Sequence, residues 1–151
     1  MRIVLQRVSR ASVSVAGREL SAIGAGLLVL LAIEDADTQA DMDWLVRKIC
    51  QLRIFDDERG VMNRSLEDVD GDVLVVSQFT LMASVKKGNR PSWIRASGPG
   101  VAVPLYEQFL QKLEERIGKP AGSGEFGAHM EVSLVNDGPV TIILDTRQKD
   151  F

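Results

Sequence analysis

An uninterrupted apolar run, Gly26 to Ile33 (GLLVLLAI), constrains the fold of this chain more than any other segment. A strand with one face in water alternates apolar and polar residues, whereas this run has no polar position. It therefore predicts a strand that is covered on both faces. The longer apolar stretch that contains it, Ala22 to Ile33, is too short to span a bilayer, so no membrane association is predicted.

The segments around this strand predict a mixed α/β domain. Met1 to Val15 alternates and is rich in β-branched residues, which predicts two short strands followed by a hairpin turn at Ala16–Glu19. Thr38 can cap a helix whose apolar residues recur at helical spacing as far as Leu52. Further strands are predicted at Val73–Val76, Met130–Val135 and Val140–Leu144, and a second helix at Val103–Ile117. This order predicts a single domain over residues 1–151, with a largely antiparallel sheet and two main helices.

Charge and cysteine usage limit the compartment and the partners. The formal net charge of −3 argues against broad, non-specific binding of nucleic acid, although it leaves room for RNA at a local basic patch. The first ten residues lack the apolar core of a signal peptide. A single cysteine excludes a disulfide within the chain. We therefore expect a cytoplasmic protein.

Three patterns that resemble functional motifs fail on their context. Gly122–Gly127 matches G-x-G-x-x-G, but a predicted helix precedes it and a strand follows, so a flexible turn is expected rather than a dinucleotide site. Asp68–Asp72 has its glycine at the wrong position for a calcium loop. Cys50 and His129 are the only residues of their types, and nothing in the sequence activates the thiol. No metal and no cofactor is predicted.

Two short polar segments occur at predicted strand ends. Ser77-Gln78-Phe79-Thr80 emerges from an apolar strand, where a few hydrogen-bonded hydroxyl groups would be the ordinary explanation. Asn136-Asp137-Gly138-Pro139-Val140-Thr141 places Gly-Pro inside a strand-like stretch. Proline donates no hydrogen bond and should break the ladder there, which suggests a tight turn or a bulge, with a cis peptide bond as one option.

Together with other blocks in the same order, these two segments resemble the D-aminoacyl-tRNA deacylase family over nearly the whole chain. The further blocks are residues 1–15, 52–66, 86–93, 105–109 and 126–146. The resemblance implies a homodimeric hydrolase that cleaves the ester between a D-amino acid, or glycine, and the terminal adenosine of tRNA. It implies a cis Gly138-Pro139 bond that reaches into the partner subunit's site.

The resemblance also assigns residues to roles. Ser77, Gln78, Phe79 and Thr80 would form the catalytic platform. Substrate binding and chiral selection would belong to Asn136, Gly138, Pro139, Val140 and Thr141. Because the sequence offers no histidine base in a recognisable triad, we expect substrate-assisted hydrolysis by the 2′-hydroxyl of the ribose. The alternative, Thr80 as a covalent nucleophile, lacks an activating base.

A long segment without a regular pattern, Met82 to Gly100, follows the first motif and carries Lys86, Lys87 and Arg90. These cations are expected to contact tRNA phosphates, and a solvated charged loop is the alternative. Two other functions stay open at this point. One is a non-catalytic tRNA-binding dimer module, and the other is a generic small-ester hydrolase that uses Thr80 as its nucleophile.

Overall fold

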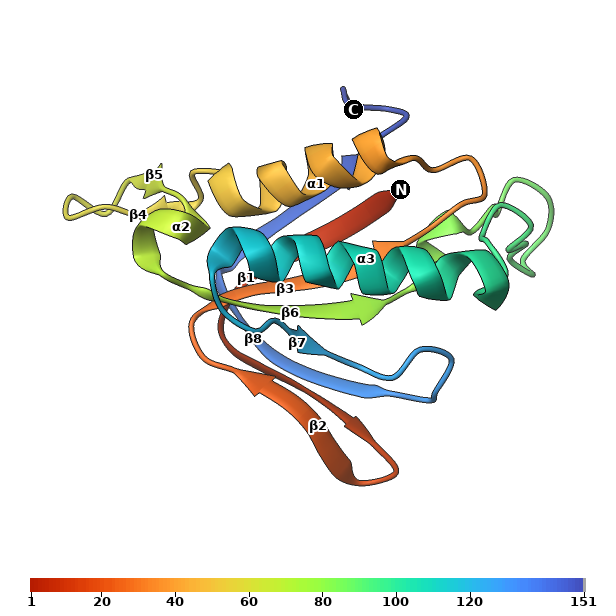
Figure 1. Ribbon diagram of the computed structural model, residues 1–151, viewed down its shortest axis with the longest axis horizontal. Coiled ribbons are helices and arrows are strands. Elements are labelled where there is room, and N and C mark those ends of the chain that lie inside the picture. Colours follow the sequence, from red (N-terminus) through yellow and green to blue (C-terminus); the bar gives the residue numbers. More distant parts are fainter. Residues whose placement is uncertain (151) are drawn as a thin grey trace.

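A six-stranded mixed sheet forms the centre of the computed structural model, which describes residues 1–150 (Figure 1). Its strands are β1 (Arg2–Val15), β2 (Arg18–Ile23), β3 (Gly26–Ala32), β6 (Asp72–Ser77), β7 (Gly122–Ser123) and β8 (Glu131–Asp145). β1 pairs antiparallel with β2, β3 and β8, whereas β3 with β6 and β6 with β7 are parallel. The predicted α/β class with a largely antiparallel sheet is confirmed.

The first strand is longer than the sequence predicted. β1 is one strand of 14 residues, so the prediction of two short strands is wrong, although the hairpin turn at Ala16–Gly17 is confirmed. Its first half pairs with β3 and its second half with β2, while β8 follows the other side along nearly the full length. Backbone partners on both sides keep the strand continuous.

Two helices, α1 (Gln39–Gln51) and α3 (Pro99–Ile117), pack side by side and cover one face of the sheet (Figure 1). Thr38 caps α1 as predicted: its hydroxyl accepts from the Asp41 N–H, and the Asp41 carboxylate accepts from the Thr38 N–H at 2.8 Å. α3 begins at Pro99, four residues before the predicted start, because Gly98 and Pro99 occupy its N-cap and first position. In the part of the chain that is described, no helix combines the length and apolarity of a membrane span.

The shorter elements lie at the edges of the two layers. They are the hairpin strands β4 (Phe55–Asp56) and β5 (Met62–Arg64), the helix α2 (Leu66–Val69) and the 3₁₀-helix η1 (Phe79–Met82). Gly122 and Ser123, expected in a flexible turn, instead pair with Leu74 and Val75 as β7. That part of the turn prediction is wrong, because an edge of β6 was available for pairing.

The apolar run of β3 is covered on both faces, as predicted. Leu27, Val29 and Leu31 face α1 and α3 in the main core. Leu28 lies in a second cluster, which contains Val8 of β1 and is covered by side chains of β2 and β8. The far face of β3 is therefore closed by the sheet curling over itself and not by further helices (Figure 1).

Candidate active site

The first polar segment lies where β6 ends. Ser77 is the last residue of β6 and pairs with Leu31 of β3, and the Gln78 N–H donates to the Leu31 carbonyl at 2.7 Å. The chain then turns into η1. Figure 1 shows β6 pointing toward the end of the molecule where the loop before α3 and the start of α3 lie. The sheet thus delivers polar groups from the core to the surface at this end.

Within this segment, the side chains of Gln78 and Thr80 contact each other. The Gln78 Nε2 group donates a hydrogen bond to Thr80 Oγ1. Phe79, between them, is 55% exposed. The hydroxyl of Thr80 therefore accepts from an amide. Among residues 1–150 no hydrogen bond links it to a histidine, lysine or carboxylate that could remove its proton.

Two cavities flank the segment. One has a volume of about 230 Å³ and is lined by Ser77, Gln78, Phe79, His129 and Met130, among others. The other, of about 70 Å³, lies on the α3 side and is lined mainly by apolar atoms, including those of Phe126. His129 is exposed and lines the larger cavity.

Tyr106 forms a wall of the smaller cavity. Its hydroxyl donates to the Val75 carbonyl at 2.7 Å, and its ring packs against Phe126 at a centroid distance of 6.1 Å. Burial raises the pKa of the Tyr106 hydroxyl to about 12. Tyr106 is therefore neutral at physiological pH, and with its proton engaged by a backbone carbonyl it serves as a structural wall.

The second polar segment forms a bulge in β8. Gln6 of β1 pairs with Thr141, and Val8 pairs with Asn136, so the four residues 137–140 project from the ladder opposite Arg7. Pairing resumes beyond them, so the predicted interruption of the ladder is confirmed as a bulge, whereas the prediction of two separate strands, Met130–Val135 and Val140–Leu144, is wrong because both belong to β8. The Gly138-Pro139 peptide bond is cis.

Asn136 and Arg7 hold this bulge in place. Asn136 Nδ2 donates to the Arg7 carbonyl at 2.9 Å and to the Val140 carbonyl at 3.0 Å. The buried Arg7 guanidinium donates through Nε to the Asp137 carbonyl at 3.1 Å and through Nη1 to the Ile54 carbonyl at 2.7 Å. Arg7 was not among the residues predicted from the sequence. The available signal was a charged residue at an inward-facing position of an otherwise apolar strand face.

Gly138 is required by the shape of the bulge. Its φ is +129°, a conformation that residues with a side chain rarely adopt. A Cβ at this position would also lie 2.8 Å from Val140 Cγ2 and 3.0 Å from the Val140 nitrogen. Gly138 and Pro139 are exposed, so the bulge presents backbone atoms outward from the edge of the sheet.

The two segments do not meet within one protomer. Along β3, Leu27 pairs with Arg7, which lies opposite the bulge, and Leu31 pairs with Ser77. Four residues separate these two positions, which is about 13 Å along the strand. Three strand spacings, from β8 across β1 and β3 to β6, add about 14 Å in the perpendicular direction. The sequence-predicted residues therefore form two separate groups.

The predicted RNA contacts lie beside the first group. Lys86, Lys87 and Arg90 are exposed in the loop that follows η1. Arg95, further along the same loop, pairs with Glu34 at 3.3 Å and is partly neutralised.

Comparison with known proteins identifies the family. The family model described as D-Tyr-tRNA(Tyr) deacylase matches residues 4–145. The chain belongs to this family. Proteins named D-aminoacyl-tRNA deacylase from Flavobacterium johnsoniae and Bacteroides thetaiotaomicron are each 58% identical to it over 99% of this chain and 100% of theirs.

Two solved structures resemble the deacylase-family fold described here. The c-Myc DNA unwinding element binding protein has a TM-score of 0.90 and 46% identity, over 96% of this chain and 98% of that one. A probable eukaryotic D-amino acid tRNA deacylase has a TM-score of 0.81 over 95% of this chain and 97% of that one, and at 21% identity it shows likeness of fold alone.

Replacing Arg7 tests whether this side chain holds the bulge. Arg7→Met keeps length and burial but leaves the carbonyl groups of Asp137 and Ile54 without their donor. We expect the free energy of unfolding, from urea denaturation, to fall by about 1–3 kcal/mol. Amide exchange at Val140 and Thr141 should accelerate. Arg7→Lys should be intermediate, because a single ammonium nitrogen cannot occupy the two positions from which Nε and Nη1 of Arg7 donate. Unchanged stability and exchange in Arg7→Met would contradict the assignment.

Proposed function

We propose that the protein hydrolyses the ester between a D-amino acid, or glycine, and the terminal adenosine of tRNA. Membership of the deacylase family and the names of its relatives support this activity. The observation in the fold that carries the proposal is the polar platform at the end of β6, flanked by two cavities. The larger cavity would receive the adenosine, and the ester would lie over Gln78, Phe79 and Thr80.

Catalysis would depend on stabilising the ester's developing oxyanion. The N–H groups of Phe79 and Thr80 open the turn of η1, where a helix has donors without intrahelical acceptors. The Gln78 amide has two N–H donors and gives only one to Thr80, which leaves the second for substrate. Water would attack the carbonyl carbon with help from the neighbouring 2′-hydroxyl, and the 3′-oxygen of the ribose would leave.

The hydrogen bond from Gln78 to Thr80 weighs against covalent catalysis by Thr80. A threonine hydroxyl needs a base to attack an ester at neutral pH. Here its oxygen accepts from an amide, which makes it less nucleophilic rather than more. We therefore assign Ser77, Gln78, Phe79 and Thr80 to binding and stabilisation.

Chiral selection would come from the bulge of a second subunit. Gly138 and Pro139 lie far from the platform of their own chain but are exposed, so a symmetric dimer could exchange them between sites. Backbone atoms of the bulge, held by Asn136, would then face the substrate α-carbon. An L side chain would collide with them, a D side chain would point away, and glycine would pass.

The free edge of the sheet supports self-association. β8 is a 15-residue strand that pairs with β1 alone within residues 1–150, and it carries Val135 and Ile143 at 41% and 48% exposure. Long exposed edge strands are usually covered, because their free backbone groups recruit other chains. A homodimer would cover this edge or the face beside it.

One assay separates the proposed activity from its alternatives. The protein is incubated with D-tyrosyl-tRNA, L-tyrosyl-tRNA and free D-tyrosine ethyl ester, and released tyrosine is measured. We expect cleavage of the first alone. Comparable cleavage of the free ester would favour a generic esterase. Binding of tRNA without any cleavage would favour a non-catalytic module.

The role of Thr80 is tested against that of the substrate's own hydroxyl. We expect Thr80→Ala to change kcat by less than about tenfold, because a supporting hydrogen bond contributes about 0.5–1.5 kcal/mol. The kcat for a D-aminoacyl-tRNA that ends in 2′-deoxyadenosine should fall by far more than this. Thr80→Ser serves as the matched control. Abolition of turnover in Thr80→Ala, together with a trappable acyl-enzyme, would establish the nucleophile mechanism instead.

Mixing two inactive variants tests whether the site is shared between subunits. Gln78→Ala damages the platform, and Gly138→Ala damages the bulge. After denaturation and refolding together, half of the dimers are mixed and each has one intact composite site. Activity should return to about a quarter of the wild-type value, as expected for a two-fold interface. No recovery, with mixed dimers verified by mass spectrometry, would place both segments in the same subunit's site.

A further inference from the structure

An exposed aromatic pair lies beside the platform. The rings of Phe79 and Trp93 meet edge to face, with centroids 5.5 Å apart and planes at 79°. Phe79 is 55% exposed and Trp93 39% exposed. Aromatic rings usually lie in the core or in an interface, because they bury large apolar areas there. Phe79 belongs to the platform, whereas nothing so far assigns a role to Trp93.

Backbone hydrogen bonds hold Trp93 in position. Ser84 and Ser92 exchange N–H···O bonds of 2.8 and 2.9 Å, which close the base of the loop immediately before Trp93. The Trp93 carbonyl accepts from the Ala96 N–H at 2.9 Å, and the Ser97 N–H donates to the Ile33 carbonyl at the end of the sheet. The indole is therefore presented from an anchored turn and not from a free loop tip.

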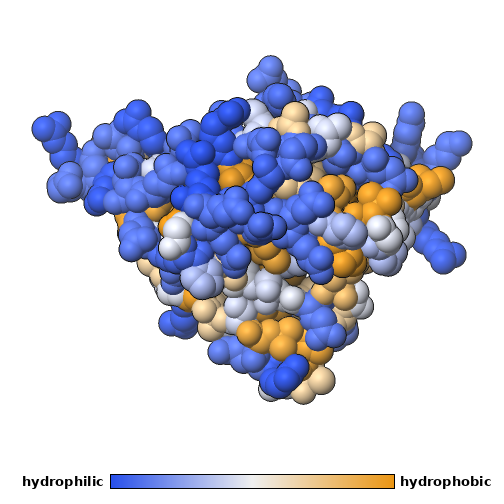
Figure 2. Space-filling model, in the orientation of Figure 1, coloured by the Kyte–Doolittle hydropathy of each residue, from blue (hydrophilic) through white to orange (hydrophobic). Residues whose placement is uncertain are grey.

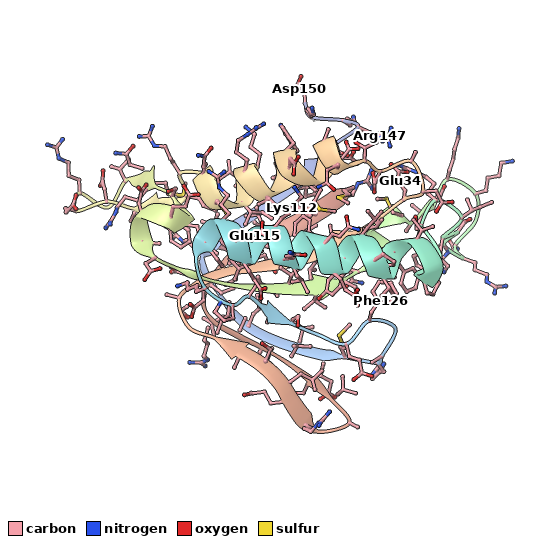
Figure 3. The ribbon with its side chains drawn as sticks, viewed as in Figure 1. Glu34, Lys112, Glu115, Phe126, Arg147 and Asp150 are labelled. Atoms are coloured by element: carbon pink, nitrogen blue, oxygen red, sulfur yellow. The ribbon has the colours of Figure 1, made fainter. Side chains whose placement is uncertain are left out.

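The surface around the indole combines apolar and basic side chains. We define the aromatic–basic loop as residues 84–95. Val85 and Ile94 within it are 67% and 89% exposed, and its lysines and Arg90 are also exposed. Figure 2 shows hydrophobic residues gathered at the end of the molecule where this loop and the start of α3 lie. Figure 3 shows long nitrogen-tipped side chains extending from the same loop into solvent.

We infer that the aromatic–basic loop binds the unpaired nucleotides that precede the terminal adenosine of tRNA, with one base stacked on Trp93. The inference rests on the proposed function, which seats the adenosine next to Phe79. Surfaces for single-stranded nucleic acid combine aromatic rings, which stack bases, with cations that follow the backbone. The Trp93 ring lies 5.5 Å from the Phe79 ring, centroid to centroid, so a nucleotide next to the adenosine can reach it.

Charge favours RNA over a second copy of this chain as the occupant. Protein–protein interfaces are depleted in lysine, whereas phosphate-binding surfaces are enriched in it. Lys86, Lys87 and Arg90 lie within a few residues of the indole in a chain whose net charge is −3. Because the cations are concentrated in this loop of an otherwise acidic protein, we expect a polyanion to bind at this surface and not elsewhere on the molecule.

A comparison of substrates tests the stacking. KM and kcat are measured for D-tyrosyl-tRNA and for D-tyrosyl-adenosine, which lacks the preceding nucleotides. We expect Trp93→Ala to raise KM for the tRNA substrate roughly tenfold, since stacking of one base is typically lost by such a truncation. The effect on D-tyrosyl-adenosine should be several-fold smaller. Trp93→Phe should retain most of the affinity, and Val101→Ala, an exposed apolar residue outside the loop, is the matched control.

Binding of RNA is measured separately from hydrolysis. Trp93 is the only indole left in a Trp44→Phe background, so its fluorescence reports directly on stacking. Titration with the oligonucleotide ACCA should quench it, whereas a blunt RNA duplex should not. This readout remains even if the protein cleaves no ester, so failure of the proposed function and failure of the stacking are distinguishable.

Three outcomes would overturn the inference. An equal increase in KM of Trp93→Ala for D-tyrosyl-tRNA and for D-tyrosyl-adenosine would mean that Trp93 acts only by supporting Phe79. Unchanged KM for tRNA together with unquenched fluorescence would mean that no base stacks there. Dissociation of Trp93→Ala dimers in sedimentation, with RNA affinity intact, would assign the surface to a second copy of the chain. Circular dichroism and thermal unfolding of each variant show that the fold is retained.

Discussion

The pairing of β1 with β8 is the constraint on which the rest of the structure depends. β1 pairs along one edge with both β2 and β3, and this pairing lets the sheet curl over the core. Its other edge carries β8, and the mismatch in their register opposite Arg7 creates the bulge. Because Arg7 lies on β1 and the bulge on β8, the ladder that organises the fold also fixes where the Gly138-Pro139 pair projects.

The same sheet divides the candidate site residues into two separate groups. The platform ends a central parallel strand, where the backbone pairing of Gln78 with Leu31 fixes its position. The bulge projects from an edge strand, where it is free to contact another molecule. This arrangement explains why a monomer can contain all the expected residues and still not bring them together. The proposed dimer would be a requirement for catalysis rather than an addition to stability.

Local patterns in the sequence predicted those elements whose stability is decided locally. The cap at Thr38 and the turn at Ala16–Gly17 each depend on neighbouring residues, and each is confirmed. The buried strand at Gly26–Ile33 is also confirmed, because its apolar run records burial on both faces even though remote elements cover it. Elements defined by distant partners were not predictable in this way. The unbroken β1, the pairing of Gly122 and Ser123, and the continuous β8 all depend on strands that are remote in sequence.

The sequence by itself determined the family, the fold class and the two polar segments. The reason is that ordered blocks of residues and apolar periodicity are properties of the linear sequence. Tertiary structure decided the geometry of the site. Arg7 became visible as the support of the bulge only when the ladder brought Asp137 to it. The separation of the two segments, and the contact of Trp93 with Phe79, likewise come from strand order and loop closure. These are relations between distant residues, which no local pattern records.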